Sequence, residues 1–340
     1  MMKKDNKLIN FISDNKTMFV FLVFLLIASI LFSDRNFLAA NNMVNILLKS
    51  VRNGGMLAIG MTFVIIAGEI DLSGGAVLAL SGVVMGLVGA YNPVLGIIAG
   101  IGVGIISGLL IGFMVNHMKI SSWIASLAML FGVRGLILIL AERSIPIQGD
   151  ILTFANTNLF RDMIPGLNSG VSILIFIFFA IVLISMFALR HTRFGTSLYA
   201  VGGNSEAAKM MGINVNKIKM SAFILSGVLA SLSGVLLASN SGSATLSAGN
   251  IYETYAIAMC AIGGVKLSGG EGKMSGTFFG ILIFFTINTL FTYMPQLTVH
   301  WQSIIMGALV LLTVALQSDT LKGITRFYAQ EKVQETVEEG

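Results

Sequence analysis

The sequence predicts an all-α polytopic membrane protein with about ten transmembrane helices, some of them short or broken. Hydrophobic residues make up 55% of the 340 residues and charged residues only 11%, whereas a soluble domain is about 25% charged. The mean hydropathy of +0.88 and the 38 glycines beside four prolines are typical of helices that pack closely in a bilayer. We therefore expect most of the chain to form one helical bundle.

Ten apolar segments follow one another along the chain, and several are shorter than the ~20 residues that cross a bilayer. They are 17–32, 54–68, 76–90, 93–115, 121–141, 171–189, 220–239, 252–265, 276–293 and 298–316. Short, glycine-interrupted segments are typical of helices that break at membrane depth. The first segment is interpreted as an uncleaved span, because more spans follow it and no clear cleavage site does.

Lys and Arg indicate which side of the membrane each loop faces. With a cytosolic N-terminus and alternating spans, cytosolic segments carry 15 of the 21 Lys and Arg residues and outer segments carry five, while Arg134 lies inside a span. Basic residues favour the cytosolic side, so both termini are predicted to be cytosolic. The predicted organisation is a cytosolic segment at 1–16, one transmembrane domain at 17–317 and a charged tail at 318–340. The basic loops also explain the pI of 9.3 without a nucleic-acid partner.

A glycine recurs at every fourth residue of the fourth span. The five positions are Gly96, Gly100, Gly104, Gly108 and Gly112. Each step of four residues turns a helix about 40° past a full turn, so these glycines form a winding groove along it. Such a groove lets a neighbouring helix approach closely, and we expect a packing seam.

Two carboxylates interrupt the apolar sequence between the second and third spans. Glu69 and Asp71 lie where isolated burial of a charge is costly. We expect a break between two helices near a polar path, with these carboxylates solvated, paired or capping the next helix together with Ser73. Gly74 and Gly75 permit backbone conformations that an unbroken helix does not have. A surface turn and direct proton coupling are the alternatives.

Two further polar features are candidates for such a path. Arg134 lies about 10 Å from the outer end of its predicted span at 1.5 Å per residue, so it either snorkels to the surface or lines the path. The stretch 239–249, with Asn240, is small, hydroxyl-rich and uncharged; it either lines a path for a neutral solute or forms a flexible loop. The outer segment 142–170 is either a docking surface for an outside partner or a lid.

No catalytic or metal-binding motif is recognisable in the sequence. His117, His191 and His300 are far apart and lack zinc-ligand spacing. The run GGEGKM at 269–274 lacks the full glycine spacing and the Ser or Thr of a phosphate-binding loop. A single cysteine, Cys260, excludes a disulfide within the chain. The chain is predicted not to be an enzyme and to hold no cofactor, so any ATP and Mg²⁺ would bind another chain.

The longest polar interruption, 190–219, holds five of the 21 Lys and Arg residues and is predicted to be cytosolic. Within it, Asn204 or Ser205 can cap a two-turn helix at about 205–211, and Gly212 can end it. A helix this short needs a packing partner, which is either another protein or its own bundle. The candidate contact residues are Asn204, Glu206, Ala207, Ala208 and Gly212.

Three stretches carry a family resemblance that covers roughly residues 50 to 316. They are GMTFVIIAGEIDLSGG (60–75), RFG (193–195) followed by AVGGNSEAAKMMGIN (200–214), and IGG (262–264) followed by LSGGEG (267–272). With these stretches the chain resembles the permease subunits of ribose-type bacterial ABC importers. The second stretch looks like the cytoplasmic segment that engages the ATPase in that family. The family's common form has Gly where this chain has Glu69, and a small apolar residue at Gly74.

The resemblance implies the function and the partners. It implies a type II ABC importer-like bundle in the bacterial inner membrane, which translocates a monosaccharide such as a pentose or hexose. It also implies a second permease subunit, identical or different, a cytosolic ABC ATPase that binds ATP and Mg²⁺, and an extracytoplasmic sugar-binding protein. The residues themselves leave alternatives open: an ion-coupled secondary transporter using Glu69 or Asp71, a membrane scaffold or receptor, and an intramembrane enzyme.

Overall fold

The computed structural model describes residues 16–31, 37–147, 156–159 and 170–294, and seven single positions between 301 and 315. The chain divides into two units, Met1–Pro295 and Gln296–Gly340. The described positions of the second unit are helical. The predicted segments 1–15 and 318–340, and most of the predicted span 298–316, lie outside the described residues.

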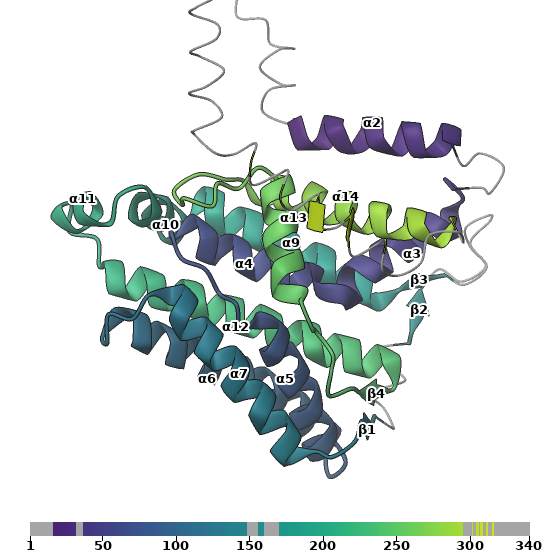
Figure 1. Cartoon of the computed structure of the whole chain (residues 1–340), viewed down its shortest axis with the longest axis horizontal. Coiled ribbons are helices and arrows are strands. Elements are labelled where there is room, and N and C mark those ends of the chain that lie inside the picture. Colours follow the sequence, from purple (N-terminus) through teal and green to yellow (C-terminus); the bar gives the residue numbers. More distant parts are fainter. Residues whose placement is uncertain are drawn as a thin grey trace, which may run out of the picture. The chain divides into compact units, whose positions relative to one another are not determined.

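The described part of the first unit is almost wholly helical (Figure 1), which confirms the all-α prediction. Five described helices are long and apolar enough to cross a membrane. They are α6 (Pro93–Asn116), α7 (Ser122–Leu140), α9 (Ile173–His191), α12 (Val215–Ser241) and α14 (Met274–Thr292). Two shorter apolar helices, α2 (Lys16–Leu31) and α5 (Gly74–Gly89), add to them. The chain is therefore a multi-span membrane protein.

The second span begins earlier than predicted. Its helices are α3 (Ala40–Ser50), η2 (Val51–Gly55) and α4 (Met56–Ile66). Asn53 and Gly54 leave helical geometry, with Gly54 at φ +102°, a conformation that glycine adopts readily. A helix directly before residue 54 was not predicted, because the polar Lys49 and Arg52 interrupt the apolar run that marks a span. Lys49 donates to the hydroxyl of Thr289 on α14 (3.3 Å).

The core is built from α5, α6 and α12, and the glycines of α6 line their contacts. A Cβ added at Gly104 would lie 2.1 Å from the carbonyl oxygen of Gly227 on α12, and one added at Gly227 would lie equally close to that of Gly104. Helices can approach this closely only where side chains are absent. The Ser81 hydroxyl of α5 also donates to the Ser231 carbonyl (2.9 Å). The predicted packing seam is confirmed.

The bundle has two distinct ends (Figure 1). The first, which we call the α11 end, holds α10 (Arg193–Gly203) and α11 (Ser205–Met210). The opposite end, the β end, holds two short antiparallel pairs. They are β1 (Ile145–Pro146) with β4 (Ser243–Ala244), and β2 (Asn158–Leu159) with β3 (Val171–Ser172). α10 was not predicted; it starts where the Thr192 hydroxyl accepts from the Gly195 N–H (3.3 Å).

Two breaks interrupt the spans. The first break, residues 67–73, separates α4 from α5, and the second break, residues 242–251, separates α12 from α13 (Tyr252–Ile262). α5 has 16 residues and α13 has 11, fewer than the ~20 that cross a bilayer. Both helices are therefore too short to cross a membrane alone, in agreement with the predicted short or broken spans.

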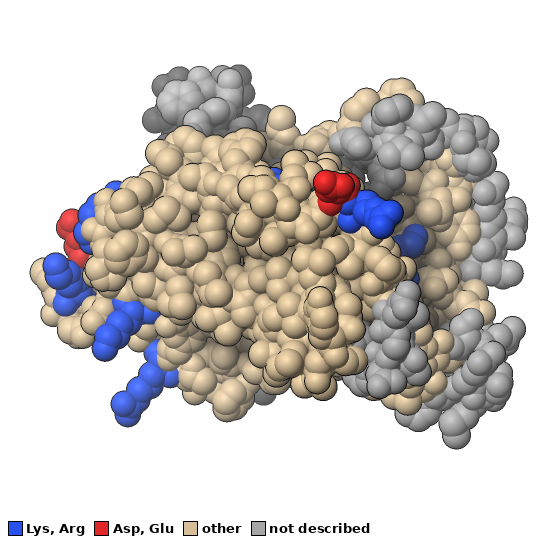
Figure 2. All heavy atoms as spheres, turned by 90° about the horizontal axis from the view of Figure 1, so that it is seen from below, with Lys and Arg blue, Asp and Glu red and all other residues tan. Residues whose placement is uncertain are grey.

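Basic side chains gather at the α11 end of the face shown in Figure 2, while most of the remaining surface is uncharged. Exposed cations at this end include Arg190, Arg193, Lys209 and Lys217. A basic rim at one end of an apolar bundle is the pattern that sets membrane orientation.

Candidate functional site

The first break begins where α4 ends at the α11 end. Gly68 takes a φ of +77°, which redirects the chain, and a Cβ added there would lie 3.5 Å from Gly202 of α10. The Gly270 N–H donates to the Ile66 carbonyl (2.9 Å). The last turn of α4 is therefore held by two other segments of the α11 end.

Asp71 is the buried anchor of the first break. Its side chain is 2% exposed, and it accepts the Ser73 N–H (2.9 Å) and the Ser73 hydroxyl (2.6 Å) at Oδ1. Its Oδ2 accepts the Ser226 hydroxyl of α12 (2.8 Å). Buried polar groups are stable when hydrogen-bonded, and this carboxylate is bonded at both oxygens. Asp71 joins the start of α5 to α12, so it does not belong to a surface turn.

Glu69 and Lys219 form an ion pair across the bundle. Glu69 belongs to the first break and Lys219 to the second turn of α12. The Glu69 side chain is 12% exposed and that of Lys219 is 20% exposed. A cavity of about 790 Å³ lies beside the pair and is also lined by Lys119, Glu206 and Lys209.

The second break is held by Arg134 of α7. Its guanidinium donates to the carbonyl oxygens of Leu246 (3.2 Å) and Ala248 (2.9 Å). Arg134 is only partly exposed, so it does not simply snorkel to the surface; it fixes the backbone of the break.

The two breaks meet at the starts of α5 and α13. A Cβ added at Gly75 would lie 2.2 Å from the Gly249 carbonyl oxygen and 2.4 Å from Oε2 of Glu253. Glu253 Oε2 is buried and has no hydrogen-bond partner among the described residues. The carboxylate also interacts electrostatically with the positive charge of Arg134 and the negative charge of Asp71. Glu253 was not among the predicted path residues, although an acidic residue within an apolar span is itself a signal of function.

Asn240 lies elsewhere. Its side-chain amide donates to the Asn156 side chain (3.2 Å) near the β end, about four turns along α12 from Ser226. Of the predicted path residues, the structure therefore joins Asp71 to Ser73 and places Arg134 at the second break. Glu69 lies in the ion pair with Lys219, and Asn240 lies apart from the others.

α11 has the predicted N-terminal cap, but the apolar residues that it exposes are not the predicted contact residues. Asn204 Oδ1 accepts the N–H groups of Glu206 and Ala207 (both 3.0 Å), and Gly212 ends the helix at φ +82°. Ala208 is fully buried, so its side chain packs within the chain and is not available to a partner. The exposed apolar residues, which sequence analysis missed, are Met210 (84%) and Met211 (69%).

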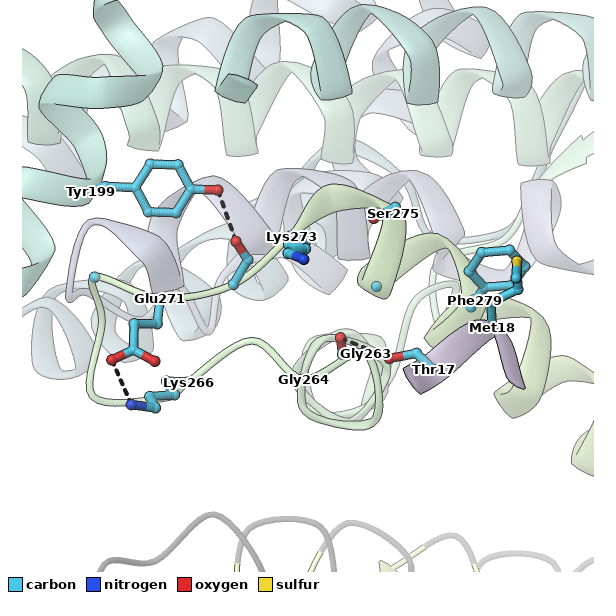
Figure 3. Close-up of a pocket in the computed structure, with 13 residues that line it drawn as sticks. Thr17, Met18, Tyr199, Gly263, Gly264, Lys266, Glu271, Lys273, Ser275 and Phe279 are labelled. Atoms are coloured by element: carbon cyan, nitrogen blue, oxygen red, sulfur yellow. Dashed lines mark hydrogen bonds and ion pairs between the residues drawn. The ribbon is translucent and has the colours of Figure 1, made fainter. Parts of the chain in front are cut away.

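A second cavity, of about 500 Å³, is lined by the loop between α13 and α14 and by residues of α2, α10 and α14 (Figure 3). The Tyr199 hydroxyl donates to the Gly272 carbonyl (2.8 Å), and burial raises the pKa of Tyr199. Lys266 and Glu271 form an ion pair across this loop (2.6 Å). The Thr17 hydroxyl of α2 donates to the Gly263 carbonyl (3.4 Å). No group of three His, Cys, Asp or Glu in the described part of the chain could hold a metal ion.

Comparison with known proteins decides the family. The model of the family described as "Branched-chain amino acid transport system / permease component" matches residues 42–314. The chain belongs to this permease family. The ribose import permease protein RbsC of Escherichia coli (strain K12) is 34% identical over 90% of this chain and 94% of its own length. RbsC of Bacillus subtilis (strain 168) is 37% identical over 86% of this chain and 90% of its own.

Other relatives of this permease are named for other pentoses. The L-arabinose ABC transporter permease protein AraH of Azospirillum brasilense is 34% identical over 88% of this chain and 86% of its own length. No solved structure matches the permease. The resemblance to ribose-type ABC permeases is confirmed.

Proposed function

We propose that this chain is the transmembrane subunit of an ATP-driven importer that translocates a monosaccharide, of the pentose or hexose type, across the bacterial inner membrane. A separate ABC ATPase binds ATP and Mg²⁺, a second permease subunit completes the path, and an extracytoplasmic binding protein delivers the sugar. The relatives named for ribose, arabinose and xylose import support this substrate class.

The capped helix α11 at the cationic end carries the proposal. Its basic surroundings favour the cytosolic side, where a cytosolic ATPase can reach α11. This orientation places both termini in the cytosol. The organisation is then a cytosolic segment at 1–16, a transmembrane domain at 17–317 and a charged cytosolic tail at 318–340. Adaptable methionine side chains suit a protein contact. We assign the ATPase contact to Glu206, Ala207, Met210, Met211 and the Gly212 turn, with Asn204 and Ala208 shaping the helix.

The described contacts disfavour the ion-coupled alternative. Both oxygens of Asp71 accept hydrogen bonds, and Glu69 is paired with Lys219. A carboxylate that carries protons or sodium must be released from such partners in each cycle.

Uptake by proteoliposomes containing the permease, its ATPase and its binding protein tests the proposal. We expect pentose or hexose uptake that requires internal ATP and the binding protein, and that persists with a protonophore. Uptake without ATP that collapses with the protonophore would overturn it.

The α11 contact has a separate test. Met210→Glu places a charge on the proposed contact and should weaken ATPase association about tenfold or more, since central contact residues dominate interface energy. Thr196→Glu, which is exposed on α10, is the matched control. Equal association of the two variants would remove Met210 from the contact.

A further inference from the structure

Both carboxylates of the first break are held by one face of α12. Lys219 pairs with Glu69, and the Ser226 hydroxyl donates to Asp71 (2.8 Å). Positions 219 and 226 are about two helical turns apart, so they lie on the same face of α12. The first break is therefore attached to α12 by two side-chain contacts.

α12 is in turn joined closely to α11. The Ile213 N–H donates to the Ala208 carbonyl (3.0 Å), which closes α11 with a hydrogen-bonded turn. The Asn214 side chain then accepts the Lys217 N–H (3.0 Å) and caps α12. Because α11 and α12 are separated only by this ordered turn, a displacement of α11 passes to the first turns of α12.

The first break connects α12 to α5. Asp71 Oδ1 accepts from both the backbone and the hydroxyl of Ser73, and α5 begins at Gly74. Gly75 then touches Gly249 of the second break. A continuous set of contacts thus runs from α11 through α12 and the first break to the junction of the two breaks.

The two α12 contacts differ in how readily they separate. Asp71 is 2% exposed, and leaving a buried carboxylate without partners is strongly unfavourable. Glu69 and Lys219 remain in partial contact with solvent, and both line the cavity at the α11 end. Water can take the place of each partner, so this ion pair opens at much smaller cost.

We propose that the Glu69–Lys219 ion pair is a coupling contact within the permease that closes and opens in each transport cycle: while it is closed, the first break moves with α11, and while it is open, α11 moves without the first break. Asp71–Ser226 is the fixed pivot of this movement. Glu69 and Lys219 are positioning residues that act through the break, and their role rests on the proposed ATP-driven function.

The test uses the complete reconstituted transporter with Glu69→Gln and Lys219→Gln, and with Glu69→Lys combined with Lys219→Glu. We expect each single variant to lower the stimulation of ATPase activity by sugar-loaded binding protein about 2- to 30-fold, the range for residues that modulate coupling. Basal ATP hydrolysis and ATPase association should stay unchanged, and the exchanged pair should recover most of the stimulation. Lys217→Gln, at an exposed position two residues earlier on α12, is the matched control and should behave like the wild type.

A reversible cross-link provides a second measurement. Glu69→Cys combined with Lys219→Cys, joined by a cleavable thiol cross-linker, should abolish stimulation, and cleavage should restore it. The native Cys260 is fully buried, so it should not react.

The outcomes separate the two proposals. A wild-type transporter that neither imports sugar with ATP nor shows stimulation overturns the proposed function and this inference with it. Normal wild-type transport, with single variants indistinguishable from Lys217→Gln or with full stimulation of the cross-linked protein, overturns the inference alone.

Discussion

The two breaks are held in opposite ways. In the first break, the side chains of Glu69 and Asp71 reach out to α12. In the second break, the backbone carbonyls of Leu246 and Ala248 accept from Arg134 of α7, and this segment has no charged residue of its own. The first break should therefore be sensitive to changes of charge, and the second to changes of size and backbone. Gly75, where the two meet, should be sensitive to both.

Gly75→Val is expected to have the largest effect. Its side chain would enter the space of the Gly249 carbonyl and the Glu253 carboxylate, and overpacking of this kind costs about 3 kcal/mol. We expect a lower thermal midpoint of the purified permease and loss of sugar uptake. Gly132→Val on α7 is the control, because no atom lies within 4 Å of a Cβ added there. If both valines were equally tolerated, the close contact of the breaks would not hold in solution.

Asp71→Ala should rank second. It leaves the hydroxyls of Ser73 and Ser226 buried without their acceptor, and unsatisfied buried groups cost about 1 to 3 kcal/mol. We expect a thermal midpoint clearly below that of the wild type, and a smaller decrease for Asp71→Asn, which keeps one acceptor oxygen. Ala and Asn variants with the stability of the wild type would show that Asp71 does not hold the first break.

The fold of the core could be predicted because its signals are local. The four-residue glycine period of α6 indicates a close helix crossing by itself, and the structure places Gly104 against Gly227. The cap of α11 was predictable for the same reason, since Asn204 bonds to N–H groups two and three residues away. Such features depend on neighbours in the sequence.

The partners of the charged residues could not be predicted, because they are distant in sequence. Glu69 meets Lys219, 150 residues away, and Arg134 meets carbonyls 112 and 114 residues away. Two alternatives were open for Arg134, snorkelling to the surface and lining a path, and neither includes its hydrogen bonds to the second break. Burial of Ala208 was also not predictable, because a six-residue helix does not reveal which of its faces packs inward.

Arg134→Met should give the smallest effect, and it separates the two breaks most sharply. The Leu246 and Ala248 carbonyls lie in partly exposed residues, so water replaces the guanidinium and the loss should be only about 1 kcal/mol. We expect faster amide hydrogen exchange in residues 245–251, with exchange in the first break unchanged, and an intermediate rate for Arg134→Lys, which keeps a charge but not the paired geometry. Glu69→Gln should give the reverse pattern, with faster exchange near Ile70 only. Faster exchange in both breaks after either substitution would contradict this expectation. It would show that the Gly75–Gly249 contact makes the two breaks one unit without separate stabilities.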